Sequence, residues 1–344
     1  MRIAVIGYGG VGRAFIRLIR DKKNELLKEG IDIIVKYVIE YGGGVYDPKG
    51  IDIERFAEFS SANRDISKYS EGGTQDELFG RLIENKDVDV VIEMTSTNKE
   101  TGEPGMTHIK KSLESGFHVI TSNKGPILLA YKMLYQIALK NNVQLCIGCT
   151  TGGALPSING GIIDMAGADI VSIKGILNGT TNFILQEMET NKVEYKDALK
   201  KAQESGIAET DPTLDVEGWD TASKLLILTN VLMNEEKTVK DVNVDGITSI
   251  KASDVEQALK QGKKYKLIGK TTKVKDEIEM SVKLELINPD DPLYNVDGKN
   301  KAVQYISDTL GDLTIAGGAS GVIPAAASIL RDLININRGY KYIR

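Results

Sequence analysis

The sequence predicts an α/β protein in which a doubly wound parallel sheet of the Rossmann type is followed by an α+β domain for substrate binding and dimerisation. Three observations support this fold class. An apolar strand at residues 3–6 runs into a glycine-rich turn and then a helical pattern. Apolar strands and helices go on alternating as far as residue 147, which is typical of a parallel sheet. Between residues 266 and 309 the pattern changes to short strands separated by turns, which indicates a second sheet.

The composition excludes several classes of protein. A chain of 344 residues, at roughly 100–200 residues per domain, is expected to form two domains. With 41% hydrophobic residues and a net charge of only −5, the chain is too apolar to be mainly disordered. The balance of 43 basic against 48 acidic residues provides no broad basic surface. We therefore expect no nucleic-acid partner and no binding to a membrane.

The cysteine content and the N-terminal sequence indicate the cellular compartment of the protein. Two cysteines cannot form a disulfide framework, which favours a reducing compartment. No apolar run approaches the roughly 18 residues that a membrane helix needs. The chain enters its first strand at once, without the charged leader and apolar core of a signal peptide. These features predict a cytoplasmic protein.

The turn after the first strand carries the strongest motif. Gly7, Gly9 and Gly12 form a G-x-G-x-x-G pattern that also contains Gly10 and Val11, and a helix follows. In the Rossmann fold the first glycine permits the tight turn, the second admits a pyrophosphate, and the third lets the helix approach the strand. The helix N-terminus then faces the phosphates. We interpret these five residues as a dinucleotide-binding site; the alternative is a glycine-rich turn that has lost its ligand.

Residues at the ends of two further strands extend this site. Glu40 follows the strand at residues 31–39, where an acidic residue binds the ribose hydroxyls of NAD and repels the 2′-phosphate of NADP. It is otherwise a solvated loop glutamate. Thr95 and Ser96 follow the strand at residues 89–94 and are expected beside the nicotinamide, unless they only cap the next helix. Residues 41–44 are expected to form a flexible crossing loop, and the choice between NAD and NADP stays open.

The remaining first half continues the alternation. Helices are expected at residues 105–115 and 127–140, and strands at 117–121 and 143–147. His108 and His118 lack the spacing of metal ligands, and we interpret both as structural. Cys146 and Cys149 form a C-x-x-C pair at the end of a strand, whereas a redox pair normally opens a helix. They are expected to be buried.

The second half contains two polar segments. Residues 178–182, between a strand at 170–177 and a helix at 183–190, form a polar turn that either cradles a small polar ligand or is a capped loop. A densely acidic segment, residues 207–220, follows a helix at 195–205. It ends at Asp220, one helical turn before Lys224, so both side chains project from one face. The pair is either a surface pair worth about 0.5 kcal/mol or part of a site for an amino acid, which carries both charges.

The chain after residue 150 divides again near its end. Helix 156–165 opens the second domain, and strands are expected at 266–273, 278–286 and 302–309. A glycine-rich turn then leads into an apolar helix at residues 324–337, which can return to the first domain. We therefore predict domains at residues 1–150 and 151–316, with residues 317–344 as a returning C-terminal segment.

Taken together, the motifs resemble those of the homoserine dehydrogenase family. They occur in family order and span nearly the whole chain: the glycine motif, Ser122-Asn123-Lys124, Gly152-Gly153-Ala154-Leu155-Pro156, Asn178-Gly179-Thr180-Thr181-Asn182, the block from Gly206 through Glu209, Asp211 and Asp215 to Lys224, and Gly318-Ala319-Ser320-Gly321. The acidic block with its lysine is the most specific of them.

The resemblance implies a reversible, NAD(P)-dependent reaction between L-homoserine and L-aspartate 4-semialdehyde in amino-acid biosynthesis, carried out by a homodimer. Lys224 matches the family's proton donor, and Lys124 matches the other lysine at the reacting oxygen. The acids Glu209 and Asp220 match substrate-binding residues, and Asp215 and Thr180 are expected near them. Thr95, Lys124 and Gly321 match cofactor contacts.

The resemblance also implies a monovalent cation, such as sodium, held largely by backbone carbonyls. The matching positions are Gly148, Thr151, Gly153 and Leu155. Gly148 stands where many members have a glutamate, which puts this site in doubt. The residues after Gly321 are too few for a regulatory domain, so a short, monofunctional form is expected.

Two other functions are compatible with the same fold. One is another two-domain reductase of an amino acid semialdehyde or a related carbonyl compound. The other is a non-catalytic sensor of dinucleotides. Intact Lys124, Glu209, Asp220 and Lys224 argue against a sensor, because sensing needs no acidic block with a lysine.

Overall fold

The computed structural model describes residues 1–275 and 277–342 and divides the chain into two compact units. The first unit contains residues 1–150 and 321–344, and the second contains residues 151–320. The sequence-based boundary at residue 317 differs from this division. Strand β13, Asp312–Gly317, still belongs to the second sheet, so the chain returns to the first unit four residues later than expected.

The first unit is built on a seven-stranded sheet in the order β4-β3-β2-β1-β5-β6-β7. Five of its strands are parallel: β1 (Arg2–Ile6), β2 (Ile34–Glu40), β5 (Val90–Glu93), β6 (His118–Thr121) and β7 (Leu145–Cys146). The chain places β2 on one side of β1 and β5 on the other, so the strand order reverses at the carboxyl end of β1. Such a switch point is where α/β sheets bind ligands.

The edge of this sheet differs from the prediction for residues 41–44. Gly43 begins a strand, β3 (Gly43–Tyr46), which turns back antiparallel to β2 with Glu40 opposite Gly43. Gly42 and Gly43 have φ values of +84° and +145°, which a tight turn requires and glycine adopts without strain. The short β4 (Gly73–Thr74) extends this edge. The expected crossing loop is therefore a hairpin, and only the turn at residues 41–42 remains outside the strands.

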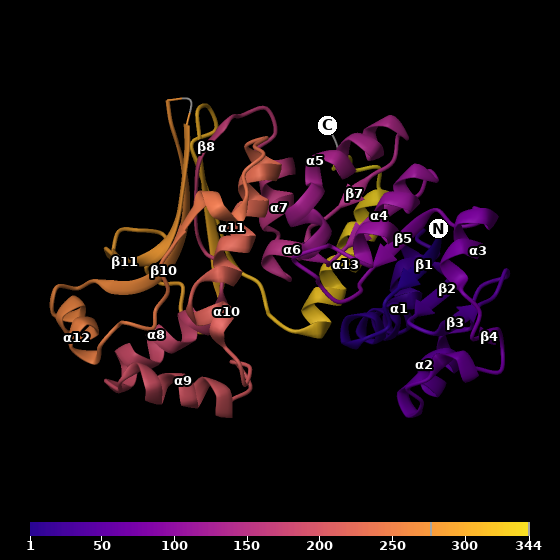
Figure 1. Cartoon of the computed structure of the whole chain (residues 1–344), viewed down its shortest axis with the longest axis horizontal. Helices are drawn as coiled ribbons and strands as arrows, with labels where there is room; N and C mark the ends of the chain where they lie inside the picture. Colours follow the sequence, from indigo (N-terminus) through magenta and orange to yellow (C-terminus); the bar gives the residue numbers. More distant parts are fainter. Residues whose placement is uncertain (276, 343–344) are drawn as a thin grey trace. The chain divides into compact units, whose positions relative to one another are not determined.

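Helices pack around the sheet in the first unit. They are α1 (Gly10–Lys28), α2 (Ile53–Ala62), α3 (Leu78–Asn85), α4 (Gly105–Glu114), α5 (Lys124–Lys140), α6 (Cys149–Gly152, which crosses the boundary) and α13 (Val322–Asn337). The C-terminal α13 lies against α1 and β6 (Figure 1). Helix α5 begins three residues earlier than predicted, because the side chain of Asn123 caps it by accepting the N–H of Gly125. Lys124 is therefore the first residue of a helix.

The second unit contains a six-stranded sheet in the order β13-β12-β8-β10-β11-β9. Its strands are β8 (Ile170–Ile176), β9 (Val242–Val244), β10 (Lys264–Val274), β11 (Glu277–Ile287), β12 (Lys301–Ser307) and β13. All neighbouring pairs are antiparallel except β9 with β11. Strands β9 and β13 were not predicted.

Helices cover one side of this sheet and carry the second polar region. They are α7 (Ser157–Asn159), α8 (Gly179–Asn191), α9 (Tyr195–Glu204), α10 (Thr213–Val216), α11 (Trp219–Leu232) and α12 (Ala252–Lys260). Helix α11 packs on β10, where a Cβ on Gly269 would lie 3.1 Å from Thr221. The predicted helix at residues 156–165 is instead the short α7 followed by a π-helical turn at Gly160–Asp164. Helix α8 begins at Gly179, so most of the polar turn lies inside it.

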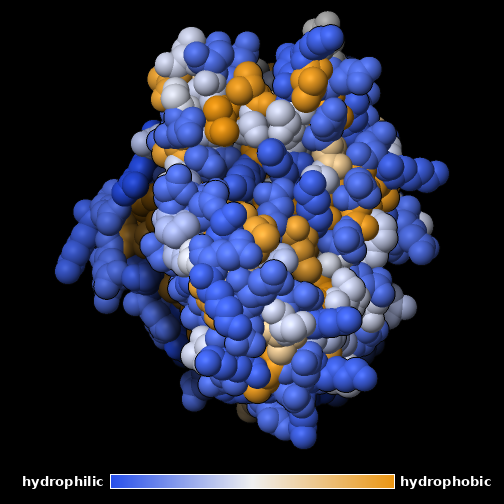
Figure 2. Space-filling view, turned by 90° about the vertical axis from the view of Figure 1, so that its left-hand side faces the viewer, coloured by the Kyte–Doolittle hydropathy of each residue, from blue (hydrophilic) through white to orange (hydrophobic). Residues whose placement is uncertain are grey.

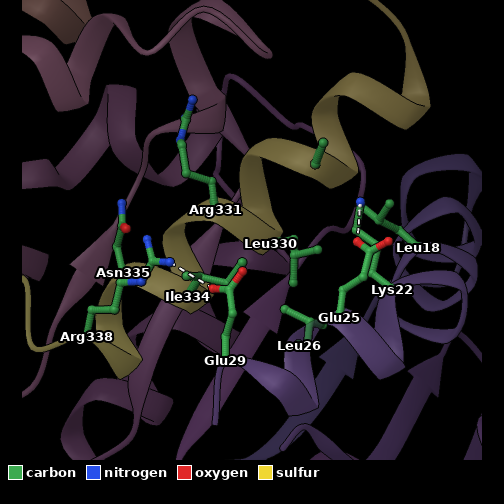
Figure 3. A pocket seen from close by; sticks show the side chains of 11 residues that line it. Leu18, Lys22, Glu25, Leu26, Glu29, Leu330, Arg331, Ile334, Asn335 and Arg338 are labelled. Atoms are coloured by element: carbon green, nitrogen blue, oxygen red, sulfur yellow. Dashed lines mark hydrogen bonds and ion pairs between the residues drawn. The ribbon is translucent and has the colours of Figure 1, made fainter. Parts of the chain in front are cut away.

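A cavity of about 320 Å³ lies between the second half of α1 and α13, and the Glu29–Arg338 ion pair crosses it (Figure 3). Because the glycine motif lies at the opposite end of α1, this cavity is not the predicted dinucleotide site. No described helix is long and apolar enough to cross a membrane.

Candidate functional site

The glycine turn of the first unit has the geometry of a phosphate-binding loop. Gly7 has φ +91°, and a Cβ there would lie 2.6 Å from the carbonyl carbon of Met94. A Cβ on Gly12 would lie 2.3 Å from the carbonyl oxygen of Gly7, so only glycine lets α1 approach β1. A Cβ on Gly9 would meet nothing within 4 Å, which leaves open space beside the backbone. The first turn of α1 has no acidic residue, so its N-terminus can receive an anion.

Gly10 and Val11, the other two residues of the glycine turn, have different surroundings. Val11 is partly exposed in the first turn of α1. Gly10 begins that helix, and a Cβ on it would lie 3.0 Å from Cγ1 of Val322 at the start of α13. Gly321 directly precedes α13, is exposed, and has φ +118°. The glycine turn, α1 and the start of α13 therefore form one neighbourhood within the first unit.

Glu40 is the last residue of β2, at the same edge of the sheet as Gly7. Its carboxyl group is partly buried, and burial raises its pKa above the ordinary value, while the positive charge of Arg13 opposes part of that rise. The Arg13 guanidinium donates to the backbone carbonyls of Ser60 and Arg64 and lies over the ring of Tyr8. The Glu40 carboxyl group therefore lies at the carboxyl end of β2, and the Arg13 guanidinium is held by backbone carbonyls.

A buried carboxylate lies at the end of β5. The Glu93 side chain has no exposed surface. Oε1 accepts the backbone N–H of Thr95 at 2.9 Å and also its hydroxyl, and Oε2 accepts the hydroxyl of Thr121 at 3.0 Å. His108 Nδ1 is 3.9 Å from Oε1, beyond hydrogen-bond distance. Donors from the ends of two neighbouring strands thus converge on one carboxylate.

Asn123 links this carboxylate to the first residue of α5. Its backbone N–H donates to Thr121 Oγ1 at 2.9 Å, and its Nδ2 donates to Thr95 Oγ1 at 3.2 Å and to the carbonyl of Ser96 at 3.4 Å. The next residue, Lys124, is partly buried at the N-terminus of the helix. A cation there is disfavoured by the helix dipole by about 0.3–1 kcal/mol, so local helix stability does not explain the lysine.

The second unit buries the Asp220–Lys224 pair. Asp220 lies in the first turn of α11 and Lys224 one turn later, and their side chains are 13% and 15% exposed. Lys224 Nζ donates to Asp220 Oδ2 and, at 2.9 Å, to the backbone carbonyl of Leu177 at the end of β8. A solvated pair on a helix surface would have neither this burial nor this third partner. The pair therefore belongs to an internal polar cluster.

Asn178 organises that cluster. Its Oδ1 accepts the N–H of Thr181 and caps α8, while its Nδ2 donates to Asp220 Oδ2 at 2.9 Å and to Asp215 Oδ1 at 2.6 Å. Thr180, which is 9% exposed, donates its hydroxyl to the carbonyl of Ile207 at 3.2 Å. The structure thus brings Asp215, Asp220 and Lys224 together. Thr180 lies in the first turn of α8, which Asn178 caps.

Glu209 is the exception among the predicted substrate-binding residues. It is exposed, and its backbone carbonyl accepts a hydrogen bond from Gln203 Nε2 at 3.2 Å. Its position in the loop after α9 leaves its carboxylate available to a ligand rather than tied into the cluster.

The two cysteines and the two histidines, which the sequence indicates to be structural, lie outside the two polar networks described above. Cys146 and Cys149 are buried, as expected, and burial raises the pKa of the Cys146 thiol. His118 Nδ1 accepts the N–H of Gln144 at 2.9 Å, and His108 packs against Phe79. No group of three metal-ligating side chains occurs among residues 1–275 and 277–342.

Comparisons with known proteins decide the family. A family model described as homoserine dehydrogenase matches residues 156–334, and one described as the NAD binding domain of homoserine dehydrogenase matches residues 7–147. The chain is 40% identical to a homoserine dehydrogenase of Methanocaldococcus jannaschii, over 99% of this chain and 100% of the relative. The chain belongs to the homoserine dehydrogenase family. It is an NAD(P)-dependent oxidoreductase that acts on an amino acid.

Other relatives agree in length and fold. An NAD(+)-dependent homoserine dehydrogenase of Pseudomonas canavaninivorans is 35% identical over 98% of this chain and 96% of its own. A hyperthermophilic archaeal homoserine dehydrogenase mutant, solved in complex with NADPH, shares the fold with a TM-score of 0.83 at 24% identity, over 100% of this chain and 99% of its own.

The residues expected to hold a monovalent cation do not fit a metal ion in this homoserine dehydrogenase. Gly148 supplies no carboxylate, and the carbonyl of Leu155 accepts the N–H of Ser157 at 2.8 Å. The buried ammonium of Lys301 donates to the carbonyl of Gly152 at 2.5 Å, inside the same turn. A second unit charge about 4 Å from that ammonium would cost about 4 kcal/mol at an effective dielectric constant of about 20. The turn already contains a cation.

Sequence reasoning did not single out Glu93, Asn123 or Lys301 as functional residues, and it considered Asn178 only as part of the polar turn at residues 178–182. The two asparagines had a usable signal, because asparagine directly before a helix is a preferred N-cap. Glu93 also had one, since an acid inside an apolar strand must find partners when it is buried. Lys301 had no local signal, because its partner lies 149 residues away in the chain.

Proposed function

We propose that this homoserine dehydrogenase interconverts L-homoserine and L-aspartate 4-semialdehyde with Lys224 as the residue that exchanges the proton. The observation that carries the proposal is the buried cluster in which Lys224 Nζ contacts Asp220 and the Leu177 carbonyl. A lysine held this way donates a proton to the oxygen of an aldehyde as it is reduced and stabilises the charge on that oxygen. The same group accepts the proton in the reverse direction.

The acids of the cluster suit the other end of the substrate. Homoserine carries an α-ammonium group, and carboxylates are its natural partners. Asp220 and Asp215 are already oriented by Asn178, and Glu209 is exposed beside them in the chain. We assign these three acids to holding the amino acid, with the Thr180 hydroxyl oxygen as a further acceptor.

The cofactor supplies the redox chemistry: the bound nicotinamide gives up or takes a hydride at the substrate carbon. The glycine turn and the N-terminus of α1 bind its pyrophosphate in this proposal. Thr95, Ser96 and Gly321 contact it further along, and Lys124 contacts both it and the reacting oxygen. The Glu93 network holds Thr95 and the start of α5 in place for that contact.

We assign a preference for NAD over NADP. Glu40 ends β2, where its carboxylate accepts hydrogen bonds from both ribose hydroxyls and repels a 2′-phosphate. Arg13, the nearby cation that would favour NADP, already donates to the carbonyls of Ser60 and Arg64. A monovalent metal ion is not part of the proposal, because Lys301 places its ammonium in the turn where that ion was expected.

We further propose that the enzyme is a cytoplasmic homodimer joined through the second sheet. Helix α11 packs on one face of that sheet, and a cavity of about 480 Å³ on β10 and β11 is lined by Lys270, Lys283, Glu279 and Glu285. A face that carries both charges can pair with its own copy about a two-fold axis. Figure 2 shows hydrophilic residues interspersed with hydrophobic ones on this side of the second unit. Light scattering of the purified protein should give twice the mass of the chain, and a monomer would contradict the assignment.

The activity itself is tested by absorbance of the reduced nicotinamide. The protein should oxidise L-homoserine and reduce L-aspartate 4-semialdehyde, with higher kcat/KM for NAD. A panel of L-serine, L-threonine and other hydroxy amino acids distinguishes this enzyme from a reductase of another carbonyl compound. Turnover of those compounds without homoserine activity would overturn the proposal, and cofactor binding without any turnover would indicate a sensor.

A further inference from the structure

Lys301 is a charged residue in an unusual position. It is the first residue of β12, opposite Gly317 of β13, and only 4% of its surface is exposed. Its Nζ donates to the backbone carbonyl of Gly152 at 2.5 Å. A buried ammonium is costly unless hydrogen-bond acceptors surround it. The backbone of this turn therefore replaces the water that the ammonium has lost.

Two glycine turns meet around the ammonium. Gly153 has φ +62°, and a Cβ on it would lie 3.5 Å from Lys301 Nζ and 3.6 Å from the carbonyl oxygen of Ala319. A Cβ on Gly318 would lie 2.5 Å from the backbone nitrogen of Leu155. Side chains at these glycines would separate the two turns. The close approach of the two turns keeps the ammonium beside the Gly152 carbonyl.

We propose that the Lys301 ammonium is the built-in monovalent cation of this turn, and that it makes a bound alkali metal ion unnecessary. Lysine suits this task because its ammonium is a compact point charge with three donors and no acceptor. It is also attached to the chain, so it does not dissociate when the salt changes. The inference goes beyond the proposed function and does not depend on the roles of Lys124 or Lys224.

Strand β12 holds the turn at Gly152 and Gly153 and also the residues that follow this turn, as far as Ser157. Tyr305, four residues along β12, donates its hydroxyl to the carbonyl of Ser157 at 2.5 Å, and Ser157 Oγ lies 2.7 Å from Thr151 Oγ1. Lys301 and Tyr305 therefore attach both ends of residues 152–157 to one strand. Loss of the ammonium is expected to loosen the first attachment and leave the second.

The test compares salts and variants. Wild-type protein is measured in sodium, potassium and choline chloride at one ionic strength, by thermal melting and by homoserine oxidation, and both readouts should be the same in the three salts.

Lys301→Ala opens space beside the carbonyls, so its Tm should fall and should rise again with sodium or potassium but not with choline, as binding to the folded state requires. Lys301→Met fills the space without charge, so its Tm should fall without recovery in any salt. Lys273→Ala, an exposed lysine on β10, is the control and should melt as the wild type does.

The broadening of the ²³Na resonance is a second readout that needs no activity. Sodium should show no specific binding to wild-type protein and saturable binding to Lys301→Ala. A wild-type enzyme that loses activity or Tm in choline would show that a metal ion binds here in spite of Lys301. An unchanged Tm in both Lys301 variants would show that the ammonium does not support the turn. If neither variant folds, the wild-type salt series and its sodium spectrum still decide the proposal.

Discussion

The two units each build a polar network around an asparagine that follows a strand and caps a helix. Asn123 lies between β6 and α5, and Asn178 lies between β8 and α8. In both, the side-chain oxygen accepts a backbone N–H of the first helical turn, and the side-chain nitrogen donates toward a polar cluster. The same local device therefore organises both candidate sites.

The networks differ in what they place against their carboxylates. Glu93 receives hydrogen bonds from neutral groups, namely an amide and two hydroxyls, whereas Asp220 receives one from an amide and one from the Lys224 ammonium. Neutral donors have a fixed direction and suit holding a loop in one position. An ammonium that shares a carboxylate can exchange a proton and can adjust to a charged substrate. We therefore expect the first network to position a loop and the second to take part in the chemistry.

Removal of the ammonium should have the largest effect. If Lys224 exchanges the proton, Lys224→Met should lower kcat by at least about 10²-fold, the usual range for general acid–base catalysis, and leave the affinity for the cofactor unchanged. Single-turnover kinetics and cofactor titration separate the two quantities. Lys260→Met is the matched control, because Lys260 pairs with Glu256 at the same i,i+4 spacing but on an exposed face. A kcat near wild type in Lys224→Met would make the pair structural.

Glu93→Gln tests the network without an ammonium. The glutamine amide would direct an N–H at a hydroxyl, Thr121 or Thr95, that now donates to the carboxylate, so one O–H would lose its acceptor. Leaving a buried donor unsatisfied costs about 1–3 kcal/mol, and the loop at Thr95 should shift. We expect a lower Tm and a Kd for the cofactor raised by about tenfold, equivalent to 1.4 kcal/mol.

The control for that variant is Ser112→Ala. Ser112 is buried in α4, and its hydroxyl has no hydrogen-bond partner among the described residues. Its loss should change neither the Tm nor the Kd appreciably. A Glu93→Gln variant with normal Tm but weaker cofactor binding would show that Glu93 contacts the cofactor directly. Normal values for both would remove its positioning role.

Serine substitution of Asn123 or Asn178 tests whether the two networks act on different ligands. Serine is also a good N-cap but is too short to replace the side-chain N–H groups. Asn178→Ser should raise KM for homoserine, and Asn123→Ser should raise the Kd of the cofactor. Loss of one net hydrogen bond, about 0.5–1.5 kcal/mol, corresponds to a few-fold change in each case. Effects of both variants on both ligands would show that the networks are not independent.

The sequence predicted the first unit more completely than the second, and the reason is the distance over which each signal acts. Gly12 has a role set by a neighbour within the motif, the carbonyl oxygen of Gly7, so the motif and its helix could be read locally. Strand β9 exists through its pairing with β11, at Val242 opposite Met280, and three residues carry no strand pattern of their own. Likewise, α5 and α8 begin with residues that form helices poorly, such as Gly179, and only their capping asparagines show where they start.

The same argument holds for the candidate site. Lys224 and Asp220 were found because helical spacing relates them directly. Their burial, which separates an internal cluster from a surface pair, depends on the end of β8 at Leu177, 47 residues before Lys224. Buried charges such as Glu93 and Lys301 need partners that sequence spacing does not identify, so their roles emerge only when the strands are paired.

The smallest expected effect concerns Glu40 and the choice of cofactor. Burial raises the pKa of Glu40, so its carboxylate takes up a proton at higher pH than an ordinary glutamate, whose pKa is 4.5. The ionised form accepts the ribose hydroxyls and repels a 2′-phosphate, so the ratio of kcat/KM for NAD to that for NADP should be greatest at neutral pH. It should fall a few-fold as the pH is lowered toward the pKa of Glu40.

The 2′-phosphate also takes up a proton near pH 6, which lowers the ratio for a separate reason. Glu40→Gln removes only the first contribution, so its ratio should be smaller at neutral pH and should depend less on pH. An identical pH dependence in the variant would show that the phosphate alone is responsible and that Glu40 does not contact the ribose.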